Sequence, residues 1–142
     1  MIIGYTAGAF DLFHIGHLNL IKKSKQHCDY LIVGVTSDEL IQQTKNKMPV
    51  IPLTERLEII KSLKYVDRVV VQNNLDKVAA WRKYKYNILF SGDDWQTSVR
   101  WQHYVQELAK QNVEVIFFPY TKTTSSTLIT QVLRERVYVS GK

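Results

Sequence analysis

Two histidines in one short segment could do phosphoryl chemistry. His14 and His17 lie three residues apart, shortly after an apolar run that leads into Gly8. If a helix begins here, both imidazoles face one spot beside unpaired backbone N–H groups and the positive end of the helix dipole. Such donors can stabilise the negative charge that develops on a phosphoryl group during its transfer. The segment therefore predicts a phosphate site.

The same two residues allow other interpretations. A histidine pair at this spacing is often incidental on a surface or part of a metal site, although zinc would need a third ligand. His27 and His103 are too distant in the sequence for either to be assigned that role. The position of the pair after the first strand of an alternating pattern favours the phosphate site. There Gly8 would let the backbone turn, and Gly16 would leave room for a nucleotide.

The elements that must position this segment alternate between strand and helix. Short apolar runs predict strands at residues 2–6, 30–36, 66–71, 88–90 and 113–118. Amphipathic stretches predict helices at residues 17–27, 53–63, 75–84, 101–111 and 126–136. This alternation predicts an α/β fold, a doubly wound parallel sheet of about five strands with helices on both faces. Ligands bind such sheets at the carboxyl ends of the strands, which is where the histidine pair lies.

One polar stretch, residues 42–52, shows no regular pattern and is broken by Pro49 and Pro52. It carries Lys45 and Lys47, whose charges suit phosphates. We expect a mobile loop that closes over bound phosphates.

The composition restricts the class of protein. The 142 residues, 45% hydrophobic and 23% charged, are typical of a globular chain, and we expect a single domain over residues 1–142. A net charge of +6 favours anionic ligands. Because the basic residues are scattered, we expect small anions and no nucleic acid.

Cys28 is the only cysteine, so no intrachain disulfide can form. Neither a signal peptide nor a membrane-spanning apolar stretch is found, so we expect a cytoplasmic protein without membrane contact.

Several motifs follow one another along most of the chain: Phe10-Asp11-Leu12, His14-Ile15-Gly16-His17, Asp29-Tyr30-Leu31, Ser37-Asp38-Glu39, Tyr65-Val66-Asp67 and Gly92-Asp93-Asp94-Trp95. In type and order they resemble the cytidylyltransferase family of the His-x-Gly-His nucleotidyltransferase superfamily, most closely its bacterial glycerol-3-phosphate members. Class I aminoacyl-tRNA synthetases share the histidine motif, but they are much longer, and residues 122–126 match their lysine-serine signature poorly. In the family's second signature, Tyr120 replaces an arginine and Thr123 a glycine.

The resemblance implies a Rossmann-like fold and the transfer of CMP from CTP to a small phosphorylated alcohol, with glycerol 3-phosphate as the leading acceptor. It also implies Mg²⁺ as cofactor and a homodimer that pairs through Tyr65-Val66-Asp67. The departures at Tyr120 and Thr123 keep a transferase with ATP or another acceptor as an alternative, such as ethanolamine phosphate, a sugar phosphate or a flavin precursor. A non-catalytic nucleotide-binding or RNA-binding module is a further alternative.

The resemblance also implies roles for individual residues. The catalytic residues would be His14, His17, Lys45 and Lys47. Nucleotide-binding residues would be Gly8, Ala9, Phe10, Asp11, Gly16, Gly92, Asp94, Thr121, Ser125, Ser126 and Thr127. Asp38 and Arg56 would bind the acceptor, and Mg²⁺ would be held mainly by the nucleotide phosphates, with Asp11 as a candidate ligand. Without a ligand, the same residue types would instead form a polar turn, a helix cap and exposed surface charges.

Overall fold

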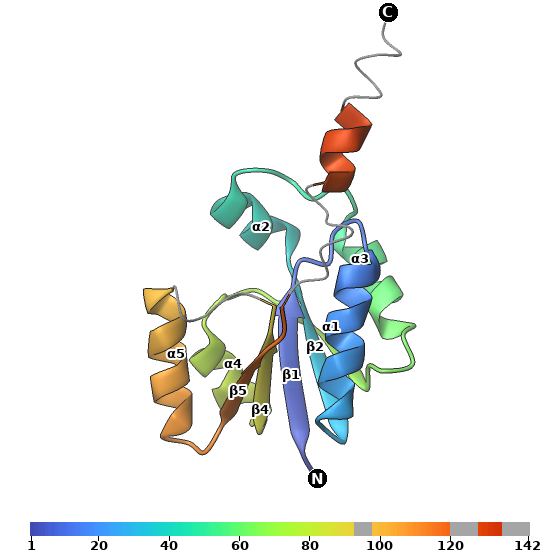
Figure 1. The fold of residues 1–142 in the computed structure, drawn as a ribbon. Helices are drawn as coiled ribbons and strands as arrows, with labels where there is room; N and C mark the ends of the chain where they lie inside the picture. Colours follow the sequence, from blue (N-terminus) through green and yellow to red (C-terminus); the bar gives the residue numbers. More distant parts are fainter. Residues whose placement is uncertain (93–97, 120–127, 135–142) are drawn as a thin grey trace, which may run out of the picture.

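Five parallel strands form one sheet in the order β3-β2-β1-β4-β5. The structure, a computed structural model, describes residues 1–92, 98–119 and 128–134. The strands are β1 (Ile3–Gly8), β2 (Tyr30–Thr36), β3 (Arg68–Gln72), β4 (Ile88–Ser91) and β5 (Glu114–Phe117). Because all neighbouring strands are parallel, their carboxyl ends lie at one edge of the sheet, the upper edge in Figure 1.

Helices cover both faces of the sheet (Figure 1). They are α1 (Ile15–Gln26), α2 (Asp38–Lys45), α3 (Leu53–Lys61), α4 (Lys77–Tyr84) and α5 (Val99–Ala109), and residues 128–134 are also helical. Side chains alternate along β2, so Val33 packs with Ile21 of α1 and Ile60 of α3, whereas Ile32 packs with Leu108 of α5. The sheet therefore separates two hydrophobic cores, and the doubly wound α/β fold expected from the sequence is confirmed.

The helix α2 was not expected, and the prediction of an irregular stretch over residues 42–52 is wrong for its first part. The hydroxyl of Ser37 accepts the amide of Leu40 at 3.1 Å and caps the start of the helix. At the other end, Asn46 adopts a left-handed conformation that closes the last turn. Residues 42–45 therefore belong to a helix, and Lys45 lies in its last turn instead of in a loop.

The turn after β1 is not made by a glycine. Gly8 is the last residue of the strand, and no glycine in the described ranges has a positive φ. The chain turns instead at Phe10 and Leu12, whose φ angles are 53° and 51°. A residue with a side chain pays about 1–2 kcal/mol for this left-handed conformation. The expected role of Gly8 in the turn is therefore wrong, and the strain lies in the segment that leads to the histidines.

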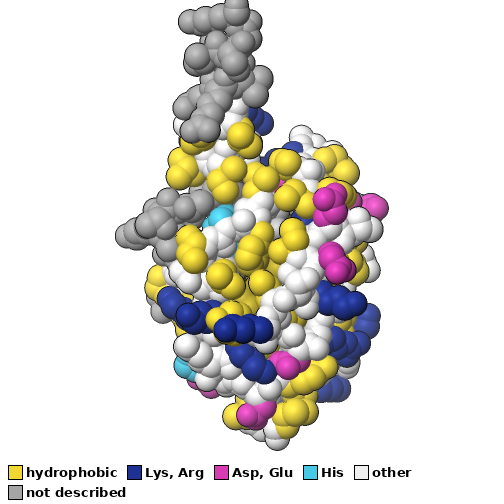
Figure 2. Space-filling model, turned by 90° about the vertical axis from the view of Figure 1, so that its right-hand side faces the viewer, with side chains coloured by type: hydrophobic (Ala, Val, Ile, Leu, Met, Phe, Trp, Pro, Cys, Tyr) yellow, Lys and Arg dark blue, Asp and Glu magenta, His cyan; other side chains and the backbone are white. Residues whose placement is uncertain are grey.

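The surface carrying α1 and α3 combines apolar and basic side chains. Figure 2 shows apolar side chains gathered in the middle of this face, with lysines and arginines beside them. Exposed apolar residues of these helices and of the segment between α2 and α3 include Ile15, Val50 and Ile59. Among the helices that the structure describes, none has the length and apolar character needed to cross a bilayer.

Candidate active site

The candidate site lies at the carboxyl ends of β1 and β4. From β1 the chain passes to α1 on one face of the sheet, and from β4 it leads to α5 on the other face (Figure 1). Ligands of open α/β sheets bind at such a switch point. Tyr5 of β1 pairs with Leu89 of β4, so Gly8 and Gly92, each three residues further on, lie level at this edge.

His14 and His17 are fixed by the start of α1. His14 is the N-cap and His17 the third helical residue, and together they form a capping box. The Nδ1 atom of His14 accepts the amide of Gly16 at 3.0 Å, and Nδ1 of His17 accepts the amide of His14 at 3.3 Å. A neutral imidazole that accepts through Nδ1 carries its proton on Nε2. With ring centroids 3.9 Å apart, the pair presents two neighbouring Nε2–H donors.

The surroundings of His17 keep it neutral. Burial is the main cause that lowers the pKa of His17 to about 4; the nearby charges of His14 and Lys45 act in the same direction, and Asp11 acts in the opposite direction. Its ring packs against the rings of Phe10 and Phe13, with centroids 5.4 and 5.5 Å away. Burial also lowers the pKa of His14. At neutral pH the two side chains therefore act as hydrogen-bond donors without a full positive charge.

The structure brings Lys45 towards the histidine pair. Its charge is close enough to lower the pKa of His17, and its side chain is exposed at the end of α2. Lys47 is exposed in the segment that follows α2. A cation and two neutral donors at one sheet edge form a suitable environment for a polyphosphate.

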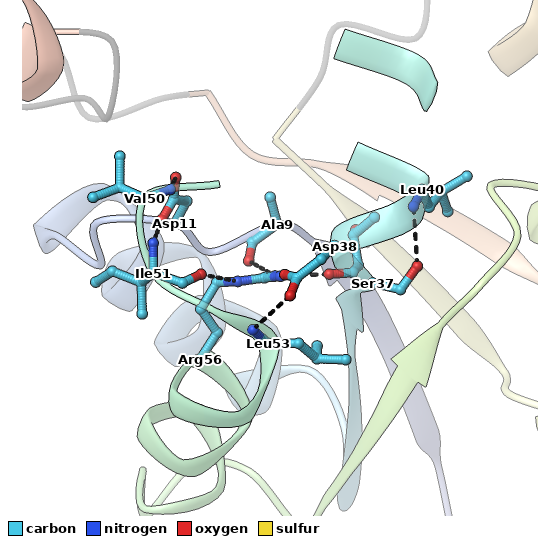
Figure 3. Close-up of polar contacts among 10 residues, drawn as sticks. Ala9, Asp11, Ser37, Asp38, Leu40, Val50, Ile51, Leu53 and Arg56 are labelled. Carbon is cyan, nitrogen blue, oxygen red and sulfur yellow. Dashed lines mark hydrogen bonds and ion pairs between the residues drawn. The ribbon is translucent and has the colours of Figure 1, made fainter. Parts of the chain in front are cut away.

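Asp11 holds the segment between α2 and α3. Its two carboxylate oxygens accept the amides of Val50 and Ile51, both at 2.9 Å (Figure 3). In the described ranges, no group of three or more His, Cys, Asp or Glu side chains could hold a metal. A site with a single carboxylate, that of Asp11, fits an ion such as Mg²⁺. This ion binds mostly through substrate phosphates and waters, with one or two carboxylates. The expected role of Asp11 as a Mg²⁺ ligand stays a prediction.

Arg56 is the most deeply buried charged residue near the site, with no exposed side-chain surface. Its guanidinium donates to the carbonyl oxygens of Ile51 at 2.8 Å, Ala9 at 2.8 Å and Thr36 at 2.7 Å. It also forms an ion pair with Asp38 at 2.5 Å (Figure 3). One side chain of α3 thus connects the turn after β1, the end of β2 and the start of α2.

This arrangement corrects the expectation that Arg56 without a ligand would be an exposed surface charge. Its donors are largely occupied by protein acceptors, and the other oxygen of Asp38 lies 3.4 Å from the amide of Leu53. Local sequence patterns do not indicate this enclosure, because the carbonyl groups of Ala9 and Thr36 are 47 and 20 residues away along the chain. Here Asp38 and Arg56 hold the walls of the site together.

The structure describes some of the other residues expected at the site. Ala9 and Phe10 lie in the turn after β1, and Gly16 lies in the first turn of α1. Asp94, Thr121, Ser125, Ser126 and Thr127 lie outside the described residues, so their expected roles remain predictions.

The parallel doubly wound sheet and the two imidazole donors at a helix start agree with a nucleotidyltransferase, the class that the comparison with known families shows. The chain belongs to the cytidylyltransferase-like family, whose model matches residues 5–132.

The individual relatives of this chain include enzymes with different substrates in their names. The chain is 30% identical to the FAD synthase of Thermococcus sibiricus over 93% of its own length and 90% of that protein. It is 32% identical to the glycerol-3-phosphate cytidylyltransferase of Bacillus subtilis, over 87% of its length and 91% of that protein. Among solved structures, the lipopolysaccharide core biosynthesis protein of Thermoplasma volcanium has a TM-score of 0.70 and 28% identity, covering 87% of this chain and 99% of that one.

Proposed function

We propose that the protein transfers CMP from CTP to a small phosphorylated alcohol, with glycerol 3-phosphate as the leading acceptor, and releases pyrophosphate. The observation that carries this proposal is the pair of Nε2–H donors that His14 and His17 present beside the amides of α1. The similarity to the glycerol-3-phosphate cytidylyltransferase of Bacillus subtilis supports the choice of nucleotide and acceptor.

In the proposed reaction a phosphate oxygen of the acceptor attacks the α-phosphorus of CTP. The new phosphorus–oxygen bond forms as the bond to the β-phosphate oxygen breaks, and pyrophosphate leaves with the electron pair. A phosphomonoester has a second pKa of about 6, so the nucleophile is already ionised at neutral pH and needs no strong base. A histidine with a pKa of about 4 suits this reaction, because it stays neutral and donates hydrogen bonds.

Each residue of the site then has a defined task. His14 and His17 donate from Nε2 to the oxygens of the α-phosphoryl group, where negative charge develops in the transition state. Lys45 and Lys47 hold the phosphates of the nucleotide, and bound Mg²⁺ would neutralise part of the triphosphate charge. Arg56 acts on the acceptor by holding the backbone of Ala9 and Thr36 in place, and Asp38 acts by pairing with Arg56.

A second candidate is adenylyl transfer from ATP to a flavin precursor. It is favoured by the 30% identity to the FAD synthase of Thermococcus sibiricus over 93% of this chain. The two candidates share the chemistry at the α-phosphorus and differ in the base and in the size of the acceptor.

A substrate matrix tests the proposal. The purified protein is assayed for pyrophosphate release with Mg²⁺, with CTP or ATP, and with glycerol 3-phosphate, ethanolamine phosphate, a sugar phosphate or flavin mononucleotide. We expect CTP with glycerol 3-phosphate to be turned over, and the same mixture without an acceptor to be inactive. Faster turnover with ATP would contradict the cytidylyl assignment, and turnover of CTP with another acceptor only would contradict glycerol 3-phosphate.

A further inference from the structure

A chain of buried polar side chains links α4 to the last residues of β3 and β2. The Nζ atom of Lys77, the first residue of α4, donates to Oε1 of Gln72 at 2.7 Å. The Nε2 atom of Gln72 in turn donates to Oγ1 of Thr36 at 2.9 Å. All three residues are buried, and Gln72 and Thr36 are partners in the sheet. The proposed reaction assigns no task to Gln72 or Lys77.

Lys77 determines the orientation of the Gln72 side chain. Because a lysine amino group donates, it binds the oxygen end of the amide, and the nitrogen end is then turned to the hydroxyl of Thr36. Lys77 is itself held at the start of α4, where its carbonyl oxygen accepts the hydroxyl of Tyr86 at 2.6 Å. Its Nζ atom lies 6.0 Å from the centroid of the Trp101 ring of α5. Groups of α4 and α5 therefore fix the hydroxyl of Thr36.

Thr36 is held from both faces of the sheet. Its hydroxyl accepts from Gln72, and its carbonyl oxygen accepts the guanidinium of Arg56 at 2.7 Å. The helix α3, which carries Arg56, packs on one face of the sheet, and α4, which carries Lys77, packs on the other. A buried amino group is costly to desolvate and needs an acceptor, whereas an apolar side chain of similar size needs none. Stability alone therefore does not require a lysine at position 77.

The junction held in this way is the start of α2. Ser37 directly follows Thr36, and its amide donates to the carbonyl oxygen of Gln72 at 3.0 Å. The hydroxyl and the carbonyl oxygen of Ser37 accept the amides of Leu40 and Ile41, both at 3.1 Å. Gln72 thus binds two successive residues of the junction, one through its side chain and one through its backbone.

The helix α2 transmits the position of this junction to the histidine pair. It has eight residues and is therefore about 12 Å long. Its last turn carries Lys45, whose charge acts on His17. A small rotation at the start of a rigid helix displaces the side chains at its other end, so Thr36 and Ser37 set the place of Lys45.

We propose that Lys77 is a positioning residue of the nucleotide site: through Gln72 and Thr36 it fixes the start of α2 and thereby holds Lys45 where the nucleotide phosphates bind. This inference rests on the proposed nucleotidyl transfer and adds to it a residue that touches neither substrate. Lys77 acts through the chain of hydrogen bonds, so breaking the chain at Thr36 should have the same effect as removing Lys77.

The test uses K77M and T36V, which break the chain at its two ends, and K83M as a matched control on the exposed side of α4. Methionine has about the length of lysine but no donor, and valine keeps the shape and the carbonyl group of Thr36. Amide hydrogen exchange monitors α2 directly. We expect the amides of Leu40 and Ile41 to exchange about fivefold faster or more in K77M and T36V, because each variant loses one buried hydrogen bond. Exchange in α1, and all exchange in K83M, should match the wild type.

Calorimetry with CTP or ATP and Mg²⁺, together with steady-state kinetics, measures the effect on the site. We expect the Kd and the KM of the nucleotide to rise about fivefold in K77M and T36V, with kcat close to the wild-type value. The double variant K77M/T36V should show no more than the larger single effect, since both changes break one chain. A merely structural role would lower the folded fraction, and with it kcat, while leaving the KM of the nucleotide unchanged.

The outcomes separate this inference from the proposed function. Wild-type exchange in α2 of K77M and T36V overturns the inference and leaves nucleotidyl transfer intact. An unchanged affinity for the nucleotide, or additive effects in the double variant, overturns it as well. If no combination of substrates releases pyrophosphate, the proposed function fails, and hydrogen exchange and calorimetry, which need no turnover, still decide whether Lys77 positions α2 for nucleotide binding.

Discussion

The Nδ1 atom of His17 accepts the backbone amide of His14 at 3.3 Å, so one imidazole caps a helix and presents an Nε2–H donor at the same time. Alanine at position 17 would therefore remove a helix cap together with the donor. A test of catalysis at His17 must therefore separate the loss of the cap from the loss of the donor.

His17→Asn and His17→Ala make that separation. Asparagine places an acceptor close to the position of Nδ1 and has no group at the position of Nε2, whereas alanine lacks both. We expect both variants to lower kcat by about 10²–10³, because one transition-state donor is lost, with little change in CTP affinity. Only alanine should also lower the free energy of unfolding, by about 1 kcal/mol. Near-normal kcat in His17→Asn would show that His17 has a structural role alone.

The low pKa of His17 predicts an acid-sensitive fold. In the unfolded chain this pKa is 6.5, and burial brings it to about 4 in the folded protein. On acidification the unfolded state therefore binds the proton first, so stability falls between pH 6.5 and pH 4 and this group has no further effect at lower pH. Urea unfolding at pH 7, 5.5 and 4 measures the loss. His17→Asn should lose less stability over this interval than the wild type, and an equal loss in both would contradict the assignment.

Arg56→Lys should be strongly destabilising although it keeps the charge. A lysine cannot supply the planar set of donors that reaches Ala9, Thr36 and Asp38 together. Breaking a buried pair of this kind costs about 3–5 kcal/mol. Urea denaturation measures this cost, and Lys61→Arg on the exposed side of α3 is the control. A loss below 1 kcal/mol would mean that Arg56 does not hold these segments together.

The segment between α2 and α3 should close over bound phosphates. Asp11 anchors its end through Val50 and Ile51, while Lys47 is exposed and accessible to trypsin. We expect CTP with Mg²⁺ to slow cleavage after Lys47 several-fold, and to leave cleavage after Lys110, far from the site, unchanged. Equal rates at Lys47 with and without the nucleotide would exclude closure of this segment.

A homodimer stays a prediction of this work. Its basis is the segment Tyr65-Val66-Asp67, where Lys64 lies over the ring of Tyr65, 5.3 Å from its centroid. Asp67 itself is engaged within the chain, because it pairs with Lys25 at 2.6 Å and accepts the amide of Leu31 at 2.8 Å. We therefore expect contact through Tyr65 and the exposed Lys64. Sedimentation at micromolar concentration should give a dimer that Tyr65→Asp dissociates.

The alternation of strands and helices was sufficient to predict the parallel sheet and the place of the histidine pair, because buried strands and amphipathic helices differ locally in sequence. The helix α2 has local signals as well, a capping Ser37 and a terminal Asn46. The enclosure of Arg56 could not be predicted in this way. It depends on segments far apart in the chain, and an isolated arginine in a sequence is usually exposed.

The left-handed residues Phe10 and Leu12 affect how the protein would change under laboratory evolution. Phe10 is buried in the core and has little freedom to vary, but Leu12 is only partly buried. Selection for heat resistance alone should enrich glycine or asparagine at position 12, because these residues accept the backbone angle at lower cost. Selection for turnover should retain the bulkier leucine, since a stiffer turn keeps the histidines in register. Libraries randomised at this one codon should therefore diverge according to the pressure applied.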